Sequence, residues 1–278
     1  MPPRQGFARA NGARLYYETA GSGKSLVLIH GNTLDTRMWD DQWDVFATSY
    51  QVIRYDMRGF GRSSMPTETA YSPAEDLRAL LDYLDIEQAH VLGLSRGGAV
   101  ALDYALMYPE ETLSLIFADA GLWDFPWTHY ATSVKVVREA CRASGVEAAR
   151  ALWLDHPLFA PALEKPSVAE RLQAMVADYS GWHWQHDESL RLLDPSPIER
   201  LPALNLPVLV IAGERDLPDF LAIATLLSER IPGAEKIILP NTGHMSNMEA
   251  PEAFNAAVLD FLSRTGAHEQ GIRNERPP

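Results

Sequence analysis

The sequence is poor in cysteine, because Cys141 is the single cysteine among 278 residues. One thiol excludes an internal disulfide bond and any metal site built from several cysteines. Long apolar runs are also absent, since stretches such as 26–29 are far shorter than the roughly 20 residues that span a bilayer. Residues 1–9 lack the apolar segment of a signal peptide. We therefore expect a cytoplasmic protein that does not enter a membrane.

Positive charge is scarce as well. The chain has 24 Lys and Arg residues against 37 Asp and Glu residues, which gives a net charge of −13 at pH 7. Nucleic acids and anionic membranes bind proteins through basic surfaces that displace counterions, so neither is expected as a partner. The expected partner is a small-molecule substrate. The sequence carries no signal for an oligomeric state.

The sequence does contain a regular alternation of short apolar runs and amphipathic segments. This alternation predicts an α/β protein, in which a mainly parallel sheet carries helices on both faces. Eight strands are predicted, at residues 7–11, 14–19, 26–30, 51–56, 90–94, 113–119, 208–212 and 236–239. Helices are predicted at residues 36–46, 73–84, 95–108, 220–230 and 252–262. Asn11-Gly12 is a hairpin signal between the first two strands, so the sheet should begin antiparallel.

The alternation stops after Asp119, and the next predicted strand begins only at residue 208. Residues 121–197 show helical patterns and contain five of the seven tryptophans. We predict a core formed by residues 1–120 and 198–265, a helical cap at 121–197 and a flexible tail at 266–278. Because an insertion over a catalytic edge must line its pocket, the candidate substrate-binding residues are Trp123, Trp182 and Trp184.

The pentapeptide Gly93-Leu94-Ser95-Arg96-Gly97 joins a predicted strand directly to a predicted helix. Such a reversal strains the residue at its tip and leaves room only for glycine two residues before and after it. The pattern is typical of a nucleophile elbow, which raises a hydroxyl group above the sheet. Ser95 is therefore the candidate nucleophile.

A serine nucleophile needs a base within hydrogen-bonding reach and a carboxylate that orients this base. Asp216 and His244 lie in the loops that follow the last two predicted strands. In a parallel sheet these loops share one edge with Ser95, and the order serine, acid, histidine is the one that this architecture uses. We predict a triad of Ser95, Asp216 and His244. Asp119, at the end of the sixth predicted strand, is the alternative acid.

Negative charge on a reacting carbonyl oxygen needs preorganised donors. One candidate is the backbone N–H of Arg96, at the start of the helix that follows Ser95. The second is the N–H of Asn32, with Thr33 as the alternative, in a loop that His30 should hold by hydrogen bonding. The Arg96 side chain either pairs with an acid such as Asp119 or meets a substrate carboxylate, and internal pairing is the preferred reading.

A metal site is the other kind of functional site that the sequence could form. His183 and His186 lie three residues apart, with Asp187 adjacent, and this spacing could place ligands on one helix face. A fourth ligand is not identifiable in the sequence, and hydrolysis by a serine needs no metal. We expect neither a metal nor a cofactor.

Together these motifs resemble the α/β-hydrolase fold superfamily over residues 7–264. The motifs are His30-Gly31, residues 56–64, the elbow, residues 213–216 and Gly243-His244. Residues 243–249 with Pro251, Phe254 and Asn255, and Trp39 with Gln42, look most similar to the branch of 3-oxoadipate enol-lactonases and arylesterases. The resemblance implies an α/β-hydrolase fold with an eight-stranded, mostly parallel sheet and a helical cap. It also implies cofactor-free hydrolysis of small carboxylic esters or lactones.

Two other functions stay open at this stage. One is the cleavage of a carbon–carbon bond in a ring-fission product by the same three residues. The other is a ligand receptor with a slow or vestigial hydrolase site, against which the intact Asn32 loop argues. Epoxide hydrolases and haloalkane dehalogenases are excluded, because they use an aspartate nucleophile where this chain has Ser95.

Overall fold

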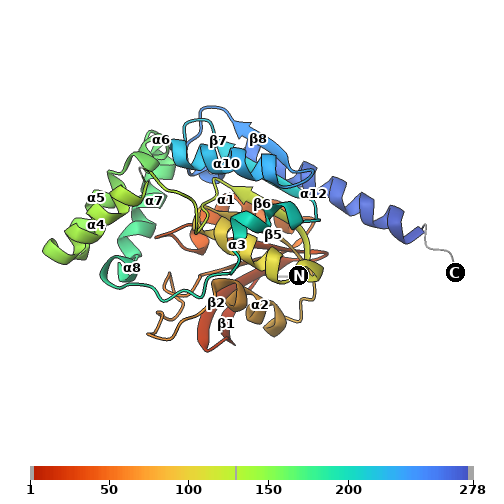
Figure 1. Ribbon diagram of the computed structural model, residues 1–278, viewed down its shortest axis with the longest axis horizontal. Coiled ribbons are helices and arrows are strands. Elements are labelled where there is room, and N and C mark those ends of the chain that lie inside the picture. Colours follow the sequence, from red (N-terminus) through yellow and green to blue (C-terminus); the bar gives the residue numbers. More distant parts are fainter. Residues whose placement is uncertain (1–2, 129, 275–278) are drawn as a thin grey trace.

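The computed structural model describes residues 3–128 and 130–274, with side chains described up to residue 265. Its centre is an eight-stranded sheet in the order β1-β2-β4-β3-β5-β6-β7-β8 (Figure 1). The strands are β1 (Arg4–Ala10), β2 (Ala13–Gly21), β3 (Ser25–Ile29), β4 (Gln51–Tyr55), β5 (Ala89–Leu94), β6 (Thr112–Ala118), β7 (Val208–Gly213) and β8 (Glu235–Leu239). Strand β2 runs antiparallel to β1 and β4, and the other neighbours are parallel. All eight predicted strands are present.

The burial of the strands and the turn between β1 and β2 explain why the sheet is parallel at its centre and antiparallel at its start. Strands β3, β5 and β7 are buried at every position, as expected for parallel strands covered on both faces, which read as continuous apolar runs. The β1–β2 hairpin turns at Asn11 and Gly12, whose φ values are 46° and 74°. Positive φ at both turn positions matches the right-handed twist of the two strands and favours an Asn-Gly pair.

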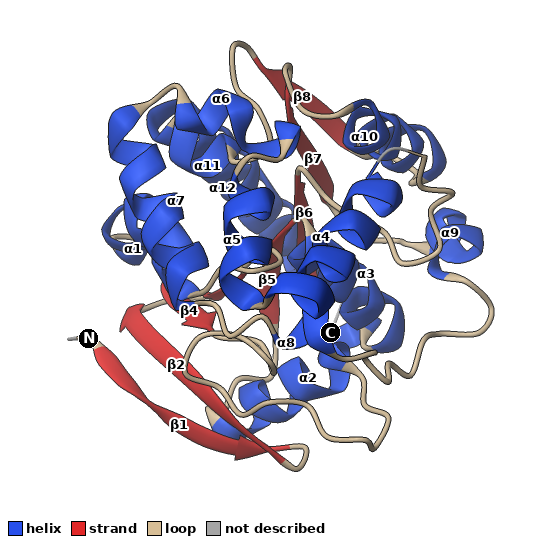
Figure 2. Cartoon of the chain, turned by 90° about the vertical axis from the view of Figure 1, so that its left-hand side faces the viewer, coloured by secondary structure: helices blue, strands red, loops and turns tan. Residues whose placement is uncertain are grey.

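Helices cover both faces of the sheet. The α-helices are α1 (Asp40–Ala47), α2 (Pro73–Tyr83), α3 (Arg96–Met107), α4 (Tyr130–Ser144), α5 (Val146–Leu154), α6 (Ala160–Leu163), α7 (Pro166–Asp178), α8 (Trp182–Gln185), α9 (Pro197–Arg200), α10 (Pro218–Arg230), α11 (Ser246–Glu249) and α12 (Pro251–Asn274). Short 3₁₀ turns are η1 (Thr36–Trp39), η2 (Pro109–Glu111), η3 (Pro157–Phe159) and η4 (Leu201–Ala203). Helices α1 and α12 pack on one face, whereas α2, α3 and α10 pack on the other (Figure 2).

The segment between β6 and β7 interrupts this layering. Its described residues form α4 to α9, η3, η4 and loops, and Leu190 makes an isolated β-bridge with Tyr71. Helices α4, α5, α7 and α8 lie together on one side of the sheet (Figure 1). We call residues 119–207 the β6–β7 segment. We propose that its residues 121–197 are the predicted cap.

The C-terminal helix differs from the expectation. Helix α12 continues to Asn274, past its predicted end at residue 262 and through part of the predicted flexible tail, residues 266–278. The added residues include Arg, Ala, Glu and Gln, which favour a helix by intrinsic propensity even without an apolar stripe. Residues 275–278 lie outside the described residues. In the described part of the chain, no helix combines the length and apolarity needed to cross a membrane.

Candidate active site

The strand-to-helix reversal centres on Ser95. Strand β5 ends at Leu94 and α3 begins at Arg96, so Ser95 alone joins them. Its backbone has φ 55° and ψ −119°. Residues other than glycine rarely adopt this conformation, which costs about 1–3 kcal/mol. The Ser95 N–H donates to Ala118 O at 3.0 Å, and Ser95 O accepts from Gly121 N at 2.9 Å. These bonds to the end of β6 and the loop after it hold the strained turn.

The two glycines of the elbow are required by close backbone contacts. A Cβ atom added at Gly93 would lie 2.1 Å from the carbonyl oxygen of Gly97, and one at Gly97 would lie 2.2 Å from Ile29 O. Real Cβ atoms essentially never come that close to backbone atoms. The glycines therefore let β5, α3 and β3 meet directly beneath Ser95.

This crowding predicts a strong effect of Gly93→Ala. The added methyl group must displace the start of α3, so the free energy of unfolding should fall by about 3 kcal/mol, and turnover should fall because Ser95 moves. Gly145→Ala is the control, because Gly145 has a positive φ of 85° but no atom within 4 Å of the added Cβ. It should cost about 1–3 kcal/mol through backbone strain alone, because its ψ of 175° lies in a region that favours glycine, and it should leave turnover intact. Urea unfolding and steady-state rates measure both; equal losses of turnover in the two variants would contradict the prediction.

His244 and Asp216 form a buried pair. The Nδ1 atom of His244 lies 2.9 Å from Oδ2 of Asp216, and neither side chain is more than 2% exposed. The other carboxylate oxygen, Oδ1, accepts the Leu217 N–H at 2.7 Å. A carboxylate can only accept, so Nδ1 of His244 carries the proton and Nε2 is the acceptor. Nε2 is buried and has no hydrogen-bond partner among the residues that the structure describes.

Asp119, the alternative acid, has different contacts. Its Oδ1 accepts the Gly213 N–H at 2.7 Å, and its Oδ2 accepts the Ser246 hydroxyl at 2.5 Å. Burial, with the neighbouring Asp216 carboxylate as a second cause, raises the pKa of Asp119. The carboxyl that contacts His244 is that of Asp216, whereas Asp119 links the end of β6 to the end of β7 and the start of α11.

Glu249, the last residue of α11, is a residue that the sequence analysis did not single out. Its carboxylate accepts the Gly243 N–H at 2.7 Å and the Met245 N–H at 3.1 Å, one on each side of His244. Burial raises its pKa. Glu249 thus fixes the backbone that carries the histidine. Its place in the segment 243–249, which the resemblance used, was the available signal.

The loop after β3 is held as predicted by His30. The Met57 N–H donates to His30 Nε2 at 2.9 Å, so Nδ1 carries the proton and donates to Gly31 O at 2.8 Å. Burial lowers the pKa of His30 to about 4, which keeps the ring neutral. From the β6–β7 segment, Trp153 Nε1 donates to the Thr33 hydroxyl at 2.8 Å. The β6–β7 segment and the sheet therefore meet at this loop.

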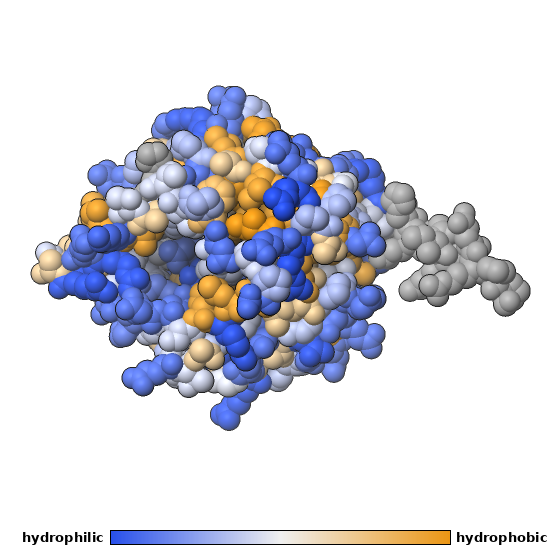
Figure 3. Space-filling model, viewed as in Figure 1, coloured by the Kyte–Doolittle hydropathy of each residue, from blue (hydrophilic) through white to orange (hydrophobic). Residues whose placement is uncertain are grey.

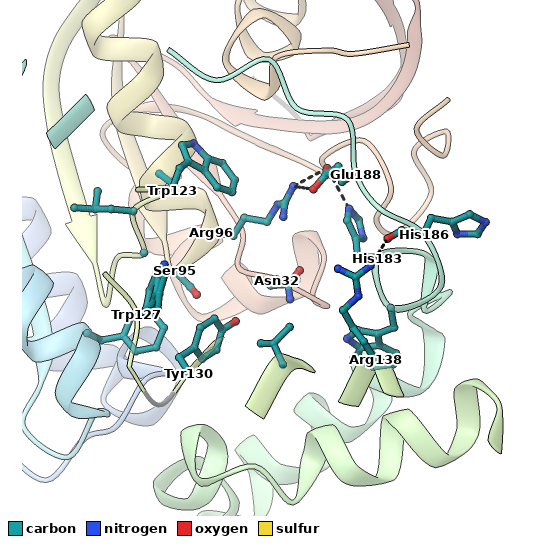
Figure 4. A pocket seen from close by; sticks show the side chains of 16 residues that line it. Asn32, Ser95, Arg96, Trp123, Trp127, Tyr130, Arg138, His183, His186 and Glu188 are labelled. Carbon is teal, nitrogen blue, oxygen red and sulfur yellow. Dashed lines mark hydrogen bonds and ion pairs between the residues drawn. The ribbon is translucent and has the colours of Figure 1, made fainter. Parts of the chain in front are cut away.

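A cavity of about 250 Å³ lies above Ser95. Its lining combines α3, the loop after β6, α4 and α8, and Figure 3 shows the hollow between α8 and α3. Asn32, Ser95 and Tyr130 face it together in Figure 4. A second, smaller space is lined by both Ser95 and His244, together with Asn32 and Trp153. The serine and the histidine thus share one enclosed space.

The tryptophans predicted to bind substrate divide into two groups. Trp123 and Trp184 line the cavity, whereas Trp182 does not. Side chains two residues apart on a helix are rotated by about 200° and so point to nearly opposite sides. Helix α8 therefore cannot direct both Trp182 and Trp184 into the cavity. Trp182 instead stacks on His186, with ring centroids 4.9 Å apart. Trp127 also lines the cavity.

Arg96 pairs with a different acid from the one expected. Its Nη2 donates to both carboxylate oxygens of Glu188, at 2.7 and 2.6 Å (Figure 4). Asp119 was the example named from the sequence, but its two oxygens bond Gly213 and Ser246. The actual partner comes from the β6–β7 segment, whose path over α3 no local pattern reveals.

His183 and His186 do not form a ligand pair. The His183 ring stacks on Phe60 at 4.4 Å and lies 2.7 Å from the Tyr179 hydroxyl through Nδ1, whereas His186 stacks on Trp182. Within residues 3–128 and 130–274, no group of three or more His, Cys, Asp or Glu side chains could hold a metal ion.

Trp123 is supported by a buried acid. Its Nε1 donates to Asp103 Oδ2 at 2.9 Å, and burial raises the pKa of Asp103 to about 7. An unfolded aspartate ionises near pH 3.9, so between these values the folded protein binds the extra proton. The contribution of Asp103 to the free energy of unfolding is therefore present at low pH, and it is lost as the pH rises toward 7. We expect Asp103→Asn, which does not titrate, to gain about 2–4 kcal/mol relative to wild type between pH 4.5 and 8.

Urea unfolding of both proteins at the two pH values measures this difference. Asp124→Asn is a control, because Asp124 acts on Asp103 through its charge but is itself exposed. A stability difference between Asp103→Asn and wild type that does not change with pH would contradict the prediction.

Comparison with known proteins gives consistent results. The model of a family described as alpha/beta hydrolase fold matches residues 24–251. The 3-oxoadipate enol-lactonase 2 of Acinetobacter baylyi is 32% identical over 262 residues, covering 92% of this chain and 95% of that protein. A 2-hydroxy-6-oxononadienedioate/2-hydroxy-6-oxononatrienedioate hydrolase of Paraburkholderia phymatum is 29% identical over 265 residues, covering 90% and 91%. The crystal structure of the enol-lactonase from Burkholderia xenovorans superposes with a TM-score of 0.80 at 26% identity, covering 93% and 100%.

Proposed function

Because the chain belongs to the α/β-hydrolase fold family, we propose that it is a serine hydrolase that cleaves small carboxylic esters or lactones. The observation that carries this proposal is the contact between His244 Nδ1 and Asp216, from which the tautomer of His244 follows. Its bond to Asp216 leaves Nε2 as a buried acceptor, in a space that Ser95 also lines. A general base next to a serine hydroxyl is the arrangement that activates this nucleophile.

The proposed reaction has two halves. Ser95 Oγ attacks the carbonyl carbon while His244 Nε2 takes its proton, and the tetrahedral oxyanion collapses as the C–O bond to the alcohol breaks. The imidazolium returns its proton to the departing alkoxide. Water then attacks the acyl-enzyme with the same base, releasing the acid and free Ser95. In a lactone the alcohol and the acid stay in one molecule.

The oxyanion is held by two backbone N–H groups in this proposal. One belongs to Arg96, the first residue of α3, where the helix dipole adds to the field. The other belongs to Asn32, which lines both spaces above Ser95. We favour Asn32 over Thr33, because Thr33 lines neither space. The residues of the cavity wall act on the rest of the substrate, and no cofactor takes part.

A substrate panel tests the proposal. We expect hydrolysis of p-nitrophenyl esters from acetate to octanoate, with an optimum at short chains because the cavity of about 250 Å³ is small. Five- and six-membered lactones run beside them decide between ester and lactone preference. A protein that cleaves neither class at a rate above the uncatalysed one would contradict the proposal.

Carbon–carbon bond hydrolysis is the second candidate. It is favoured by the 29% identity to a hydrolase whose name specifies a dienedioate, and by the proposed triad, which serves both reactions. The same protein assayed on a 2-hydroxy-6-oxodienoate and on phenyl acetate separates the two. Faster turnover of the dienoate would replace the ester proposal with this one.

A further inference from the structure

The cavity contains a buried ion pair directly beside the nucleophile. Arg96 follows Ser95 in the chain, and Glu188 reaches it from the loop after α8. Both side chains line the cavity, and they are only 14% and 12% exposed. The two bonds from Nη2, at 2.6 and 2.7 Å, join the elbow to the β6–β7 segment (Figure 4).

The groups around Glu188 are uncharged apart from Arg96. The Tyr71 hydroxyl donates to its Oε1, and His183 Nε2 lies 3.3 Å from the same atom. Burial lowers the pKa of His183 and raises that of Tyr71, so both are neutral. Burial acts to raise the pKa of Glu188 too, but the Arg96 cation beside it holds that pKa well below its usual range. Glu188 is therefore an anion that balances one cation.

The other contacts of the Arg96 guanidinium leave its positive charge to be balanced by Glu188. Its guanidinium carbon lies 5.0 Å from the centre of the Trp123 ring and 5.5 Å from that of Phe60. Aromatic faces stabilise a cation but do not neutralise it. Among the residues that line the cavity, the other charged side chain is Arg138, which pairs with Asp187 at the mouth. At the Arg96 end of the cavity the charges of Arg96 and Glu188 cancel, whereas Arg138 adds a cation whose partner, Asp187, does not line the cavity.

The pairing of Arg96 with Glu188 determines which substrate groups this end of the cavity can bind. A substrate carboxylate placed at the Arg96 end would face the Glu188 carboxylate, and it would lose its hydration without gaining an unpaired cation. An uncharged group meets no such penalty. We propose that Glu188 is a specificity-determining residue, which neutralises Arg96 and restricts this end of the cavity to uncharged groups of the ester or lactone. This inference rests on the hydrolase function proposed above.

Glu188→Gln tests the inference through substrate preference. Glutamine keeps the shape and an acceptor for Tyr71 but removes the negative charge, so Arg96 becomes an unpaired cation in the cavity. Wild type should prefer p-nitrophenyl butyrate to mono-p-nitrophenyl glutarate. In Glu188→Gln the ratio of the two kcat/KM values should shift about tenfold or more toward the anionic ester, as one charge-assisted hydrogen bond supplies.

Two matched variants control for charge. Tyr71→Phe removes a hydrogen bond to Glu188 but leaves its charge, so its substrate ratio should stay near that of wild type. The double variant Arg96→Met/Glu188→Gln removes both charges, so its ratio should also stay near that of wild type. A shift in Tyr71→Phe as large as that in Glu188→Gln would overturn the role of charge.

Binding tests the same inference without catalysis. In the Ser95→Ala background, thermal melting is followed with monomethyl glutarate, which carries its carboxylate on the acyl part, and with acetoxyacetate, which carries it on the alcohol part. Methyl butyrate is the neutral reference. At least one carboxylate should raise the melting temperature when Glu188→Gln is also present, and neither should do so when Glu188 is intact.

Each outcome decides the inference. Stabilisation by a carboxylate with Glu188 intact, or a wild-type preference for the anionic ester, overturns it even if Glu188→Gln fails to fold. Substrate ratios or shifts in melting temperature that are the same with and without Glu188→Gln overturn it as well. If the protein shows no esterase activity at all, the hydrolase proposal fails, while the melting experiment still reports on Glu188.

Discussion

Replacing Ser95 with alanine should reduce turnover of p-nitrophenyl acetate by about 10⁶-fold, the loss measured when a triad serine is removed from a serine protease. The elbow places one hydroxyl on a strained turn between β5 and α3, in the space that His244 also lines. Without Oγ no acyl-enzyme forms, and the remaining oxyanion donors act only on a slow attack by water.

The control for Ser95→Ala is Ser228→Ala on α10, a serine whose hydroxyl donates to Thr225 O within its own helix. It should retain wild-type turnover. Circular dichroism and urea unfolding of both variants show whether the fold is kept. If Ser95→Ala keeps more than a few per cent of activity while folded, the serine mechanism is wrong.

Asp216→Asn should lower kcat by about 10⁴-fold while leaving the fold intact, as the same change does in a serine protease. The local bonds explain why. Oδ1 of Asp216 accepts the Leu217 N–H, so the amide oxygen of asparagine would take that place. Its NH₂ group would then donate to His244 Nδ1 and move the ring proton to Nε2. A protonated Nε2 cannot accept the proton of Ser95.

Asp119→Asn is the matched control for this prediction, because Asp119 is also buried beside the pair but bonds Gly213 and Ser246 instead of His244. We expect a loss of turnover far below that of Asp216→Asn. Asparagine can still accept one of the two bonds, and it removes a carboxyl whose pKa burial already raises. Equal losses in the two variants would make Asp119 a joint acid and contradict the assignment.

The sheet could be predicted because its signals are local. Strands such as β3 and β7 are unbroken apolar runs, and the Asn11-Gly12 turn has a conformational requirement that few other pairs meet. The elbow is local for the same reason: Gly93 and Gly97 are fixed by contacts that any strand-to-helix reversal of this tightness creates. Loop positions at the carboxyl edge then brought Asp216 and His244 together from topology alone.

The partners of the site residues could not be predicted in the same way. Glu188 lies 92 residues from Arg96, and their contact depends on how the β6–β7 segment crosses α3. Trp153 and Thr33 are separated by 120 residues and meet for the same reason. A helix pattern also does not tell which side of the short helix α8 faces the cavity, so Trp182 was named beside Trp184. These contacts are set by packing between segments.

The covalent intermediate on Ser95 is the most direct test of the central claim. Wild-type protein is mixed with excess p-nitrophenyl acetate, quenched in acid during turnover and digested, and the peptides are examined by mass spectrometry. The account predicts one added acetyl group on the peptide that contains Gly93-Leu94-Ser95-Arg96-Gly97, located at Ser95 and absent from Ser95→Ala. An acetyl group at another residue that turns over at the steady-state rate, or full turnover without any acetylated protein, would contradict it.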